Sequence, residues 1–352
     1  MSRGDSVRRR DVRMAVGVLV LAAVAVLAPH VRVGSGQPAP PERTGRVVRH
    51  DPRFDRLVPP GATLEKVAGG FTWAEGPVWD AARGTLLVSD ISKNSVFEWR
   101  DGPGLRLFMN PSGYTGTAPF AGREPGSNGL AFDADKRLVL CEQGDRRIAR
   151  LEVDGHKTTL ADRYEGKRLN SPNDLVFARN GDLYFTDPPF GLPKGFDDPG
   201  KELGWSGVYR LTREGRLTLV TRELRAPNGI ALSPSSRTLY VSNADRSHAV
   251  WMAYDLAPDG TLGAGRIFFD ATPWTRTKKG APDGMKVDAE GNLFAAGPGG
   301  VHVFAPDGTH LGSLEPDVPT SNVAWGGDGS TLYVTASSAV YRIALTTRGL
   351  GF

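Results

Sequence analysis

Short runs of three to five apolar residues alternate with polar turns from residue 63 to the end of the chain. One stretch reads Leu130–Phe132, then Leu138–Glu142, then Arg147–Leu151, with turns rich in Asp and Gly between them. Runs of this length bounded by turn residues are typical of β-strands, and no stretch shows the period of an amphipathic helix. The pattern therefore predicts an all-β chain.

The same unit repeats along the chain. Each repeat opens on a polar turn, and about ten residues later comes a run such as Leu183–Asp187 or Leu239–Asn243. Six turns fill the opening position: Glu75-Gly76-Pro77, Asn128-Gly129-Leu130, Pro172-Asn173-Asp174, Pro227-Asn228-Gly229, Pro282-Asp283-Gly284 and Ser321-Asn322-Val323. Repeats of roughly 40 to 55 residues with several strands each indicate a β-propeller, here with six blades over residues 63–352. We expect Thr63–Val67 to add an outer strand to the last blade and so remove a free sheet edge.

The N-terminal part of the chain differs from the repeats. Arg8-Arg9-Arg10 precede an apolar run of 14 residues, Ala15 to Ala28, whereas a membrane span needs roughly 20. Residues 1–36 are therefore interpreted as a signal peptide, compatible with the twin-arginine type, or as an anchor if the segment is not cleaved. This interpretation predicts export to the periplasm or the extracellular space. Residues 37–62 are Pro-rich and non-periodic, and are interpreted as a linker or a wrapped extension.

Charge and cysteine content narrow the function classes. Residues 1–36 hold six Arg and two Asp, which equals the net charge of +4 of the whole chain, so the remainder is neutral. A nucleic-acid-binding domain would keep a basic excess in its folded part, and this partner is excluded. Cys141 is the single cysteine, which excludes an intramolecular disulfide and a Cys-based zinc site. Its apolar neighbours predict that it is buried.

The repeated polar residue is a candidate site. In a propeller the first strand of each blade lines the central channel, so Glu75, Asn173, Asn228 and Asp283 are predicted to meet at one mouth. The last three are spaced by 55 residues each. Two carboxylates and two carboxamides without sulfur suit a hard divalent cation, Ca²⁺ better than Mg²⁺. The alternative for each position is an ordinary turn.

The same residues carry a resemblance to a known family. The stretch from Trp73 to Trp79 resembles the opening motif of the gluconolactonase/regucalcin (senescence marker protein) family of six-bladed calcium propellers. Leu169–Asp174 together with Tyr184–Gly191 resembles its bacterial gluconolactonase branch, and Ala226–Ala231 and Pro282–Met285 complete the set. The resemblance implies that Glu75, Asn173, Asn228 and Asp283 hold Ca²⁺ or another divalent metal such as Zn²⁺, Mn²⁺ or Mg²⁺. One departure is Gln143, where many bacterial members have His.

These observations predict a metal-dependent hydrolase that opens sugar lactones such as gluconolactone. The metal would polarise the ester carbonyl for attack by water, with Asp283 as both ligand and base. Asn128, Glu142 and Arg147 are predicted to contact the substrate, and Asn322 to be structural. The alternatives are a non-catalytic calcium-binding propeller that binds a ligand or partner, and a phosphoesterase or other lactone hydrolase using the same site. No G-x-S-x-G motif or clustered histidines support another catalytic scheme. The sequence does not determine the oligomeric state.

Overall fold

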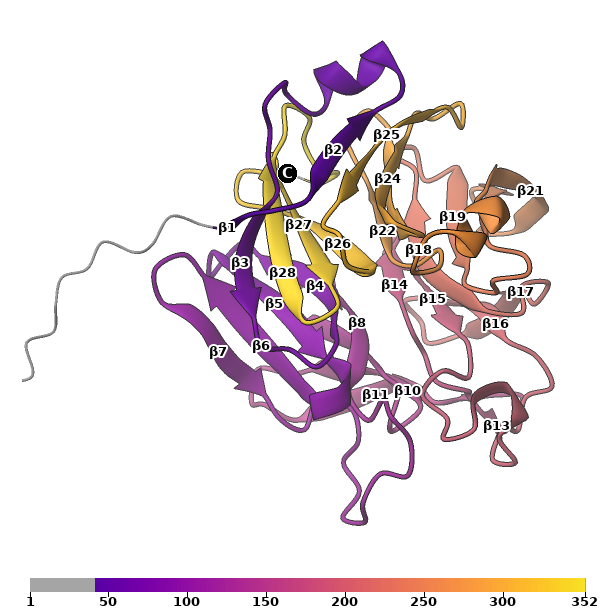
Figure 1. Cartoon of the computed structure of the whole chain (residues 1–352). Helices are drawn as coiled ribbons and strands as arrows, with labels where there is room; N and C mark the ends of the chain where they lie inside the picture. The colour runs from indigo at the N-terminus through magenta and orange to yellow at the C-terminus, as the bar shows by residue number, and fades with distance from the viewer. Residues whose placement is uncertain (1–41, 352) are drawn as a thin grey trace, which may run out of the picture. The chain divides into compact units, whose positions relative to one another are not determined.

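The computed structural model describes residues 42–351 (Figure 1). Regular structure in this range consists of β-strands and four short 3-10 helices: η1 (Pro52–Arg56), η2 (Ile91–Lys93), η3 (Gly195–Asp197) and η4 (Thr272–Arg276). The prediction of an all-β chain is confirmed. No helix within residues 42–351 has the length and apolar character needed to cross a membrane. The predicted signal peptide or anchor of residues 1–36 lies outside the described residues.

Six antiparallel sheets form the six predicted blades; blades 1 to 5 each use four strands that are consecutive along the chain, and blade 6 uses three such strands. Blades 1 to 3 contain β4 (Ala74–Asp80), β5 (Thr85–Asp90), β6 (Ser95–Arg100) and β7 (Gly104–Met109); β8 (Ser127–Phe132), β9 (Leu138–Glu142), β10 (Arg147–Leu151) and β11 (Lys157–Ala161); and β14 (Leu175–Phe177), β15 (Leu183–Asp187), β16 (Gly207–Leu211) and β17 (Leu217–Thr221). Blades 4 to 6 contain β18 (Pro227–Leu232), β19 (Thr238–Asn243), β20 (Val250–Leu256) and β21 (Leu262–Asp270); β22 (Met285–Val287), β23 (Leu293–Gly297), β24 (Gly300–Phe304) and β25 (His310–Glu315); and β26 (Thr320–Gly326), β27 (Thr331–Ala336) and β28 (Ala339–Ala344). A two-stranded hairpin, β12 (Arg163–Tyr164) and β13 (Lys167–Arg168), lies between blades 2 and 3 in the chain.

The fourth strand of blade 6 comes from the other end of the chain. Strand β3 (Glu65–Gly69) pairs antiparallel with β28, as predicted for the segment around Thr63–Val67. Two further short strands cover outer edges: β1 (Glu42–Arg43) pairs with β3, and β2 (Arg46–Arg49) pairs with β25 of blade 5. Figure 1 shows this indigo segment beside the yellow and orange strands of blades 6 and 5. Within the described residues, the Pro-rich segment thus pairs with two blades, and this backbone pairing satisfies sheet edges that would otherwise be open.

Hydrophobic clusters fill the spaces between neighbouring blades. Leu87 of blade 1 packs with Leu140 of blade 2, and Val139 and Cys141 of blade 2 pack with Phe185 of blade 3. Alternate residues of each strand point to opposite faces of its sheet, so both faces of a blade are buried against a neighbour. Cys141 is fully buried, as predicted.

Candidate metal and substrate site

The polar turn residues of successive blades gather around one cavity. It has a volume of about 330 Å³ and is lined by Glu75, Asn128, Asn173, Asn228 and Asp283, which belong to blades 1 to 5. The first four are almost fully buried, and Asp283 is half-buried. The side chains of Trp73, Ile91 and Phe190 give the cavity apolar walls. The phase of the repeat therefore brings together the four predicted metal ligands and Asn128.

Irregularities in the inner strands place these side chains. The pairing of β4 with β5 shifts register between Glu75 and Val78, and β18 with β19 shifts between Pro227 and Ile230. The corresponding pairing in blade 2 shifts between Ser127 and Leu130. A β-bulge bends its strand and redirects a side chain. In blades 3 and 5 the site residue instead precedes the strand, since β14 and β22 begin two residues after Asn173 and Asp283.

A closed ring of hydrogen bonds joins each blade to the next at the level of the site. The bonds have donor–acceptor distances of 2.6 to 2.9 Å and run from Ser89 Oγ to Asn128 O, Gly129 N to Asn173 O, Thr186 Oγ1 to Asn228 O, Ser242 Oγ to Asp283 O, Gly284 N to Ser321 O, and Ser321 Oγ to Ala74 O. Most of the acceptors are backbone carbonyls of the site residues themselves. The ring therefore fixes the backbone positions from which the site side chains project.

Steric contact with the next blade explains why glycine follows the polar residue at Gly76 and Gly229. A Cβ on Gly229 would lie 2.2 Å from the carbonyl oxygen of Asp283, and one on Gly76 would lie 1.9 Å from that of Asn128. Gly76 also has a φ of 49°, which favours glycine. Glycine therefore follows the polar residue at these positions because the backbones of neighbouring blades lie too close for a side chain.

The cavity carries more negative than positive charge. Burial raises the pKa of Glu75 above its ordinary value, and the nearby carboxyls of Asp174 and Glu124 raise it further. Burial likewise raises the pKa of Asp283 well above its usual range, with Glu75 and Asp174 adding to the effect. Asp174 is itself buried, and its Oδ2 has no hydrogen-bond partner. Lys286 offsets only part of the burial effect on Asp174. Buried carboxylates in such a group are normally paired or bound to a cation.

Residues 73–338 match the family described as "SMP-30/Gluconolactonase/LRE-like region". The chain belongs to this family. A gluconolactonase from Zymomonas mobilis is 38% identical over 99% of this chain and 100% of its own length. A solved gluconolactonase from Xanthomonas campestris has a TM-score of 0.76 and 34% identity, covering 90% of this chain and all of that one. A calcium-binding protein, regucalcin, from Agrobacterium tumefaciens has a TM-score of 0.63 and covers 80% of this chain and 95% of its own, and at 22% identity this likeness concerns the fold alone.

The predicted ligands of this family member suit a metal by their chemistry. Among residues 42–351 no group of three or more His, Cys, Asp or Glu has the arrangement of a metal site. The fit therefore depends on the mixed set of Glu75, Asp283 and the carboxamide oxygens of Asn173 and Asn228. Four oxygen donors with a formal charge of −2 suit a hard divalent cation, which would also offset the buried negative charge around Asp174.

Two of the three predicted substrate contacts lie outside the cavity lining. Asn128 lines the cavity, but Glu142 and Arg147 do not. Glu142 is fully buried and forms ion pairs with Arg147 and Lys157. Arg147 also donates to Thr159 Oγ1 at 3.0 Å. These contacts satisfy the two side chains within blade 2, so the structure does not bring them to the predicted site.

Several residues that line the cavity do not occupy the repeated turn position, so the repeat in the sequence did not predict them. Glu124 lies in the long loop between β7 and β8, and Phe190 and Arg246 follow second strands of their blades. Asp174 was visible in the sequence as the neighbour of Asn173, but only burial identifies its charge as part of the site. Asn322 lies on β26, close enough to lower the pKa of both Glu75 and Asp174. It is thus both a strand residue and a neighbour of the site.

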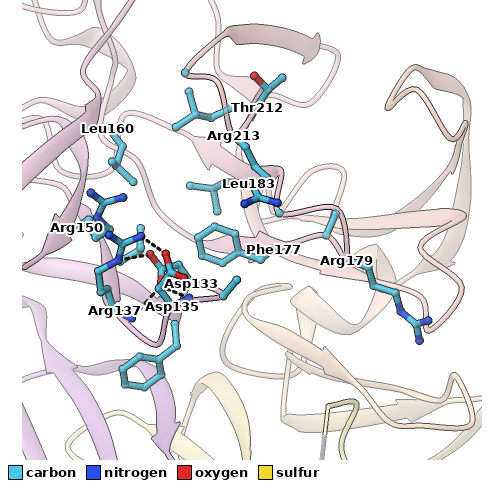
Figure 2. A pocket seen from close by; sticks show the side chains of 17 residues that line it. Asp133, Asp135, Arg137, Arg150, Leu160, Phe177, Arg179, Leu183, Thr212 and Arg213 are labelled. Carbon is cyan, nitrogen blue, oxygen red and sulfur yellow. Dashed lines mark hydrogen bonds and ion pairs between the residues drawn. The ribbon is translucent and has the colours of Figure 1, made fainter.

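A second cavity is lined by residues of blades 2 and 3. It has a volume of about 450 Å³, and Figure 2 shows Phe177, Leu183 and Leu160 among its lining side chains. The one group of opposite charges that the figure marks, Arg137 with Asp133 and Asp135, forms ion pairs at 2.9 and 2.7 Å. These side chains satisfy one another, and the cavity holds none of the predicted ligands.

Proposed function

We propose that this member of the gluconolactonase family is a divalent-metal-dependent hydrolase that opens sugar lactones such as gluconolactone. The observation that carries the proposal is the meeting of Glu75, Asn173, Asn228 and Asp283 at one cavity. The full-length similarity to the Zymomonas mobilis gluconolactonase supports the substrate class. A buried all-oxygen donor set beside apolar walls is suited to polarising an ester and limiting access of bulk water.

In this proposal four residues bind the metal, and one of them also acts as the base. Glu75, Asn173, Asn228 and Asp283 would hold the cation. When bound, the cation supplies Lewis-acid polarisation of the lactone carbonyl and stabilises the oxyanion. Asp283, which is half-buried and reaches the cavity, guides the attacking water and accepts its proton. The ring C–O bond then breaks, the protonated Asp283 gives its proton to the departing alkoxide, and the product is the open hydroxy acid.

We propose Ca²⁺ as the preferred metal. The donors are carboxylate and carboxamide oxygens, which Ca²⁺ accepts in flexible geometries, whereas Mg²⁺ usually keeps several waters. Zn²⁺ favours sites with nitrogen or sulfur donors, which this set lacks, whereas Mn²⁺ also accepts oxygen donors and is the closer competitor of Ca²⁺. Metal-free protein reconstituted with Ca²⁺, Mg²⁺, Mn²⁺ or Zn²⁺ tests this preference, and Ca²⁺ is expected to restore the highest rate of lactone hydrolysis.

The assay that tests the function offers purified protein D-glucono-1,5-lactone, other aldonolactones, an acyl-homoserine lactone and an aryl phosphoester, with and without a chelator. The proposal expects chelator-sensitive turnover of an aldonolactone. Turnover of the phosphoester alone would favour the phosphoesterase alternative. Absence of metal-dependent turnover of every compound would favour the non-catalytic calcium-binding propeller.

We also propose that residues 1–36 direct export. Three consecutive Arg before a 14-residue apolar run support a twin-arginine signal. A reporter enzyme active only after export, fused behind residues 1–36, is expected to be active, and Arg9→Lys with Arg10→Lys to abolish that activity. A reporter that stays inside the cell with the natural sequence contradicts the proposal. Mass analysis of the exported protein separates a cleaved signal from a retained anchor.

A further inference from the structure

Glu124 occupies a fixed position at the cavity although it lies outside regular structure. It follows β7 and precedes β8 in the loop 110–126. Adjacent backbone groups anchor it: Tyr114 N donates to Pro125 O at 2.7 Å, and Gly126 N donates to Ile91 O at 2.8 Å. Asn94 Nδ2 donates to Tyr114 O at 2.8 Å on the same side. The base of the loop is therefore held firmly, and Glu124 lines the same cavity as Asn128 and Asp283.

One oxygen of the Glu124 carboxyl group lacks a hydrogen-bond partner within the described residues. Its Oε2 is buried and makes no hydrogen bond. The neighbouring Gln143 is fully buried, and its Nε2 and Oε1 also make none. Burial raises the pKa of Glu124 to about 7, and Gln143 lies close enough to lower it in part. Buried polar atoms are paired in more than about 90% of cases. The unpaired Glu124 oxygen belongs to a residue that lines the cavity, so it indicates a ligand with hydrogen-bonding groups.

We propose that Glu124 is a substrate-recognition residue that bonds the hydroxyl groups of a polyhydroxylated lactone, with Gln143 as the positioning residue behind it. The inference rests on the proposed lactone hydrolysis and adds the basis of its specificity. A carboxyl group accepts a hydrogen bond from an alcohol whether or not it is protonated. The proposed metal ligands Glu75, Asn173, Asn228 and Asp283 form a separate set, which leaves Glu124 for the part of the substrate that does not react.

The same arrangement disfavours lactones without hydroxyl groups. Such a ligand would cover Glu124 without pairing its oxygen, and a buried unpaired polar group costs binding free energy. Sites that hydrogen-bond a substrate hydroxyl discriminate strongly against analogues that lack it. Glu124 therefore predicts selectivity for sugar lactones over plain alkyl lactones.

The experiment compares D-glucono-1,5-lactone with δ-valerolactone, which has the same ring without hydroxyls, in metal-loaded wild type, Glu124→Ala and Glu124→Gln. Where δ-valerolactone is not turned over, its inhibition constant replaces its rate. Glu124→Ala is expected to lower kcat/KM for gluconolactone about 10- to 100-fold, mainly through KM, because a hydrogen bond to a carboxylate is lost. Values for δ-valerolactone should match wild type, and Glu124→Gln should recover part of the loss. Arg123→Ala, in the exposed neighbouring position, is the matched control.

Two results overturn the inference: equal losses for both lactones, which would mean a structural or catalytic role, and no loss for either. Calorimetric binding of D-gluconate and valerate to the metal-loaded proteins gives a readout that does not need turnover. Glu124→Ala should weaken gluconate about 10-fold and leave valerate unchanged. If the wild type opens no lactone, the proposed function fails, and this binding comparison still decides the role of Glu124: equal gluconate affinity in both proteins contradicts it.

Discussion

At the scale of single residues, the six repeated turn positions have different roles. Glu75 and Asp283 supply charge, and Asn173 and Asn228 supply neutral oxygens at the same cavity. Because the neighbouring Asp174 adds a third buried carboxyl with an unpaired oxygen, the group is costly without a cation. This only partly compensated charge is the physical reason for proposing a metal here.

Asp283→Asn tests this assignment. The variant keeps the size of the side chain but removes the base and one negative ligand, so kcat/KM for gluconolactone is expected to fall about 10²- to 10³-fold, a typical loss when a group that stabilises the transition state is removed. Calorimetry should also show weaker Ca²⁺ binding. The exposed Asp197→Asn on η3 is the control for a carboxylate away from the cavity. A wild-type rate in Asp283→Asn would show that the residue is not the base.

The buried His302 and the half-buried His310 predict how stability depends on pH. Burial lowers the pKa of His302 to about 3 and that of His310 to about 4, whereas an unfolded histidine titrates near 6.5. Between roughly pH 4 and 6.5 the unfolded chain therefore binds protons that the folded chain does not, and the free energy of unfolding falls as the pH falls. Each imidazole steepens this slope by up to about 1.4 kcal/mol per pH unit.

His302→Gln removes one of these groups, so the slope of unfolding free energy against pH should become shallower over that range. Urea denaturation at several pH values between 4.5 and 7.5 measures it. His156→Gln, which replaces an exposed side chain, is the control. An unchanged slope in His302→Gln would mean that the imidazole does not contribute as proposed.

The sequence predicted the members of the site that share the phase of the repeat, and not the others. Glu75 and Asn228 could be found because the fold places every inner strand alike. Glu124 could not, since it lies in an irregular loop whose path depends on backbone bonds to other segments. Glu142 and Arg147 were expected to contact the substrate, but their mutual ion pair is a contact that the local sequence does not reveal.

At the scale of elements, the inter-blade hydrogen bonds connect fold and site. Ser242 on β19 accepts from Gly229 N at 2.8 Å and donates to Asp283 O at 2.9 Å. One hydroxyl thus joins blade 4 to the backbone of a predicted ligand in blade 5. Disturbing this link should affect both stability and the metal site.

Ser242→Ala is expected to destabilise the protein by about 1 to 3 kcal/mol, because two buried backbone groups lose their partner. Ca²⁺ affinity should fall with it, since Asp283 is less firmly held. Thermal unfolding and calorimetry measure the two effects, with the exposed Ser235→Ala as control. Lower stability with unchanged Ca²⁺ affinity would show that the inter-blade hydrogen bonds do not hold the metal ligands in place.

Strand positions were predictable where local pattern and fold agree. The run Leu239–Asn243 is β19 with one residue added at its start, and Leu138–Glu142 is β9 without change. Strands β1 and β2 were not predicted, because the Pro-rich segment has no period and pairs only with edges that exist in the folded protein.

At the scale of the whole molecule, the ring of blades is closed by the N-terminal segment as well as by β28. Phe54 on η1 is fully buried in the cluster between blades 5 and 6, together with Leu57 and Val58. Residue 63, where the sequence pattern begins, is therefore not the start of the packed structure. The N-terminal segment of residues 42–58 packs on blades 5 and 6, whose strands β22 to β28 lie more than 200 residues later in the chain.

Phe54→Ala is expected to lower the free energy of unfolding by about 3 to 5 kcal/mol, the usual cost of emptying a buried aromatic site. The turnover rate per folded molecule should stay that of the wild type, because Phe54 is not among the cavity-lining residues. Leu107→Ala, at a side chain that is 59% exposed, is the control and should change little. A Phe54→Ala protein as stable as wild type would show that the extension is dispensable.

The central claim is that lactone hydrolysis depends on one metal held by Glu75, Asn173, Asn228 and Asp283. The most direct test adds Ca²⁺ stepwise to metal-free protein and follows gluconolactone hydrolysis and bound metal together, in wild type and in Glu75→Gln. We predict that the wild-type rate rises with occupancy and saturates at one ion per chain, and that Glu75→Gln neither binds the ion at these concentrations nor gains activity. Full hydrolysis by the metal-free wild type, or equal activation of Glu75→Gln, would contradict it.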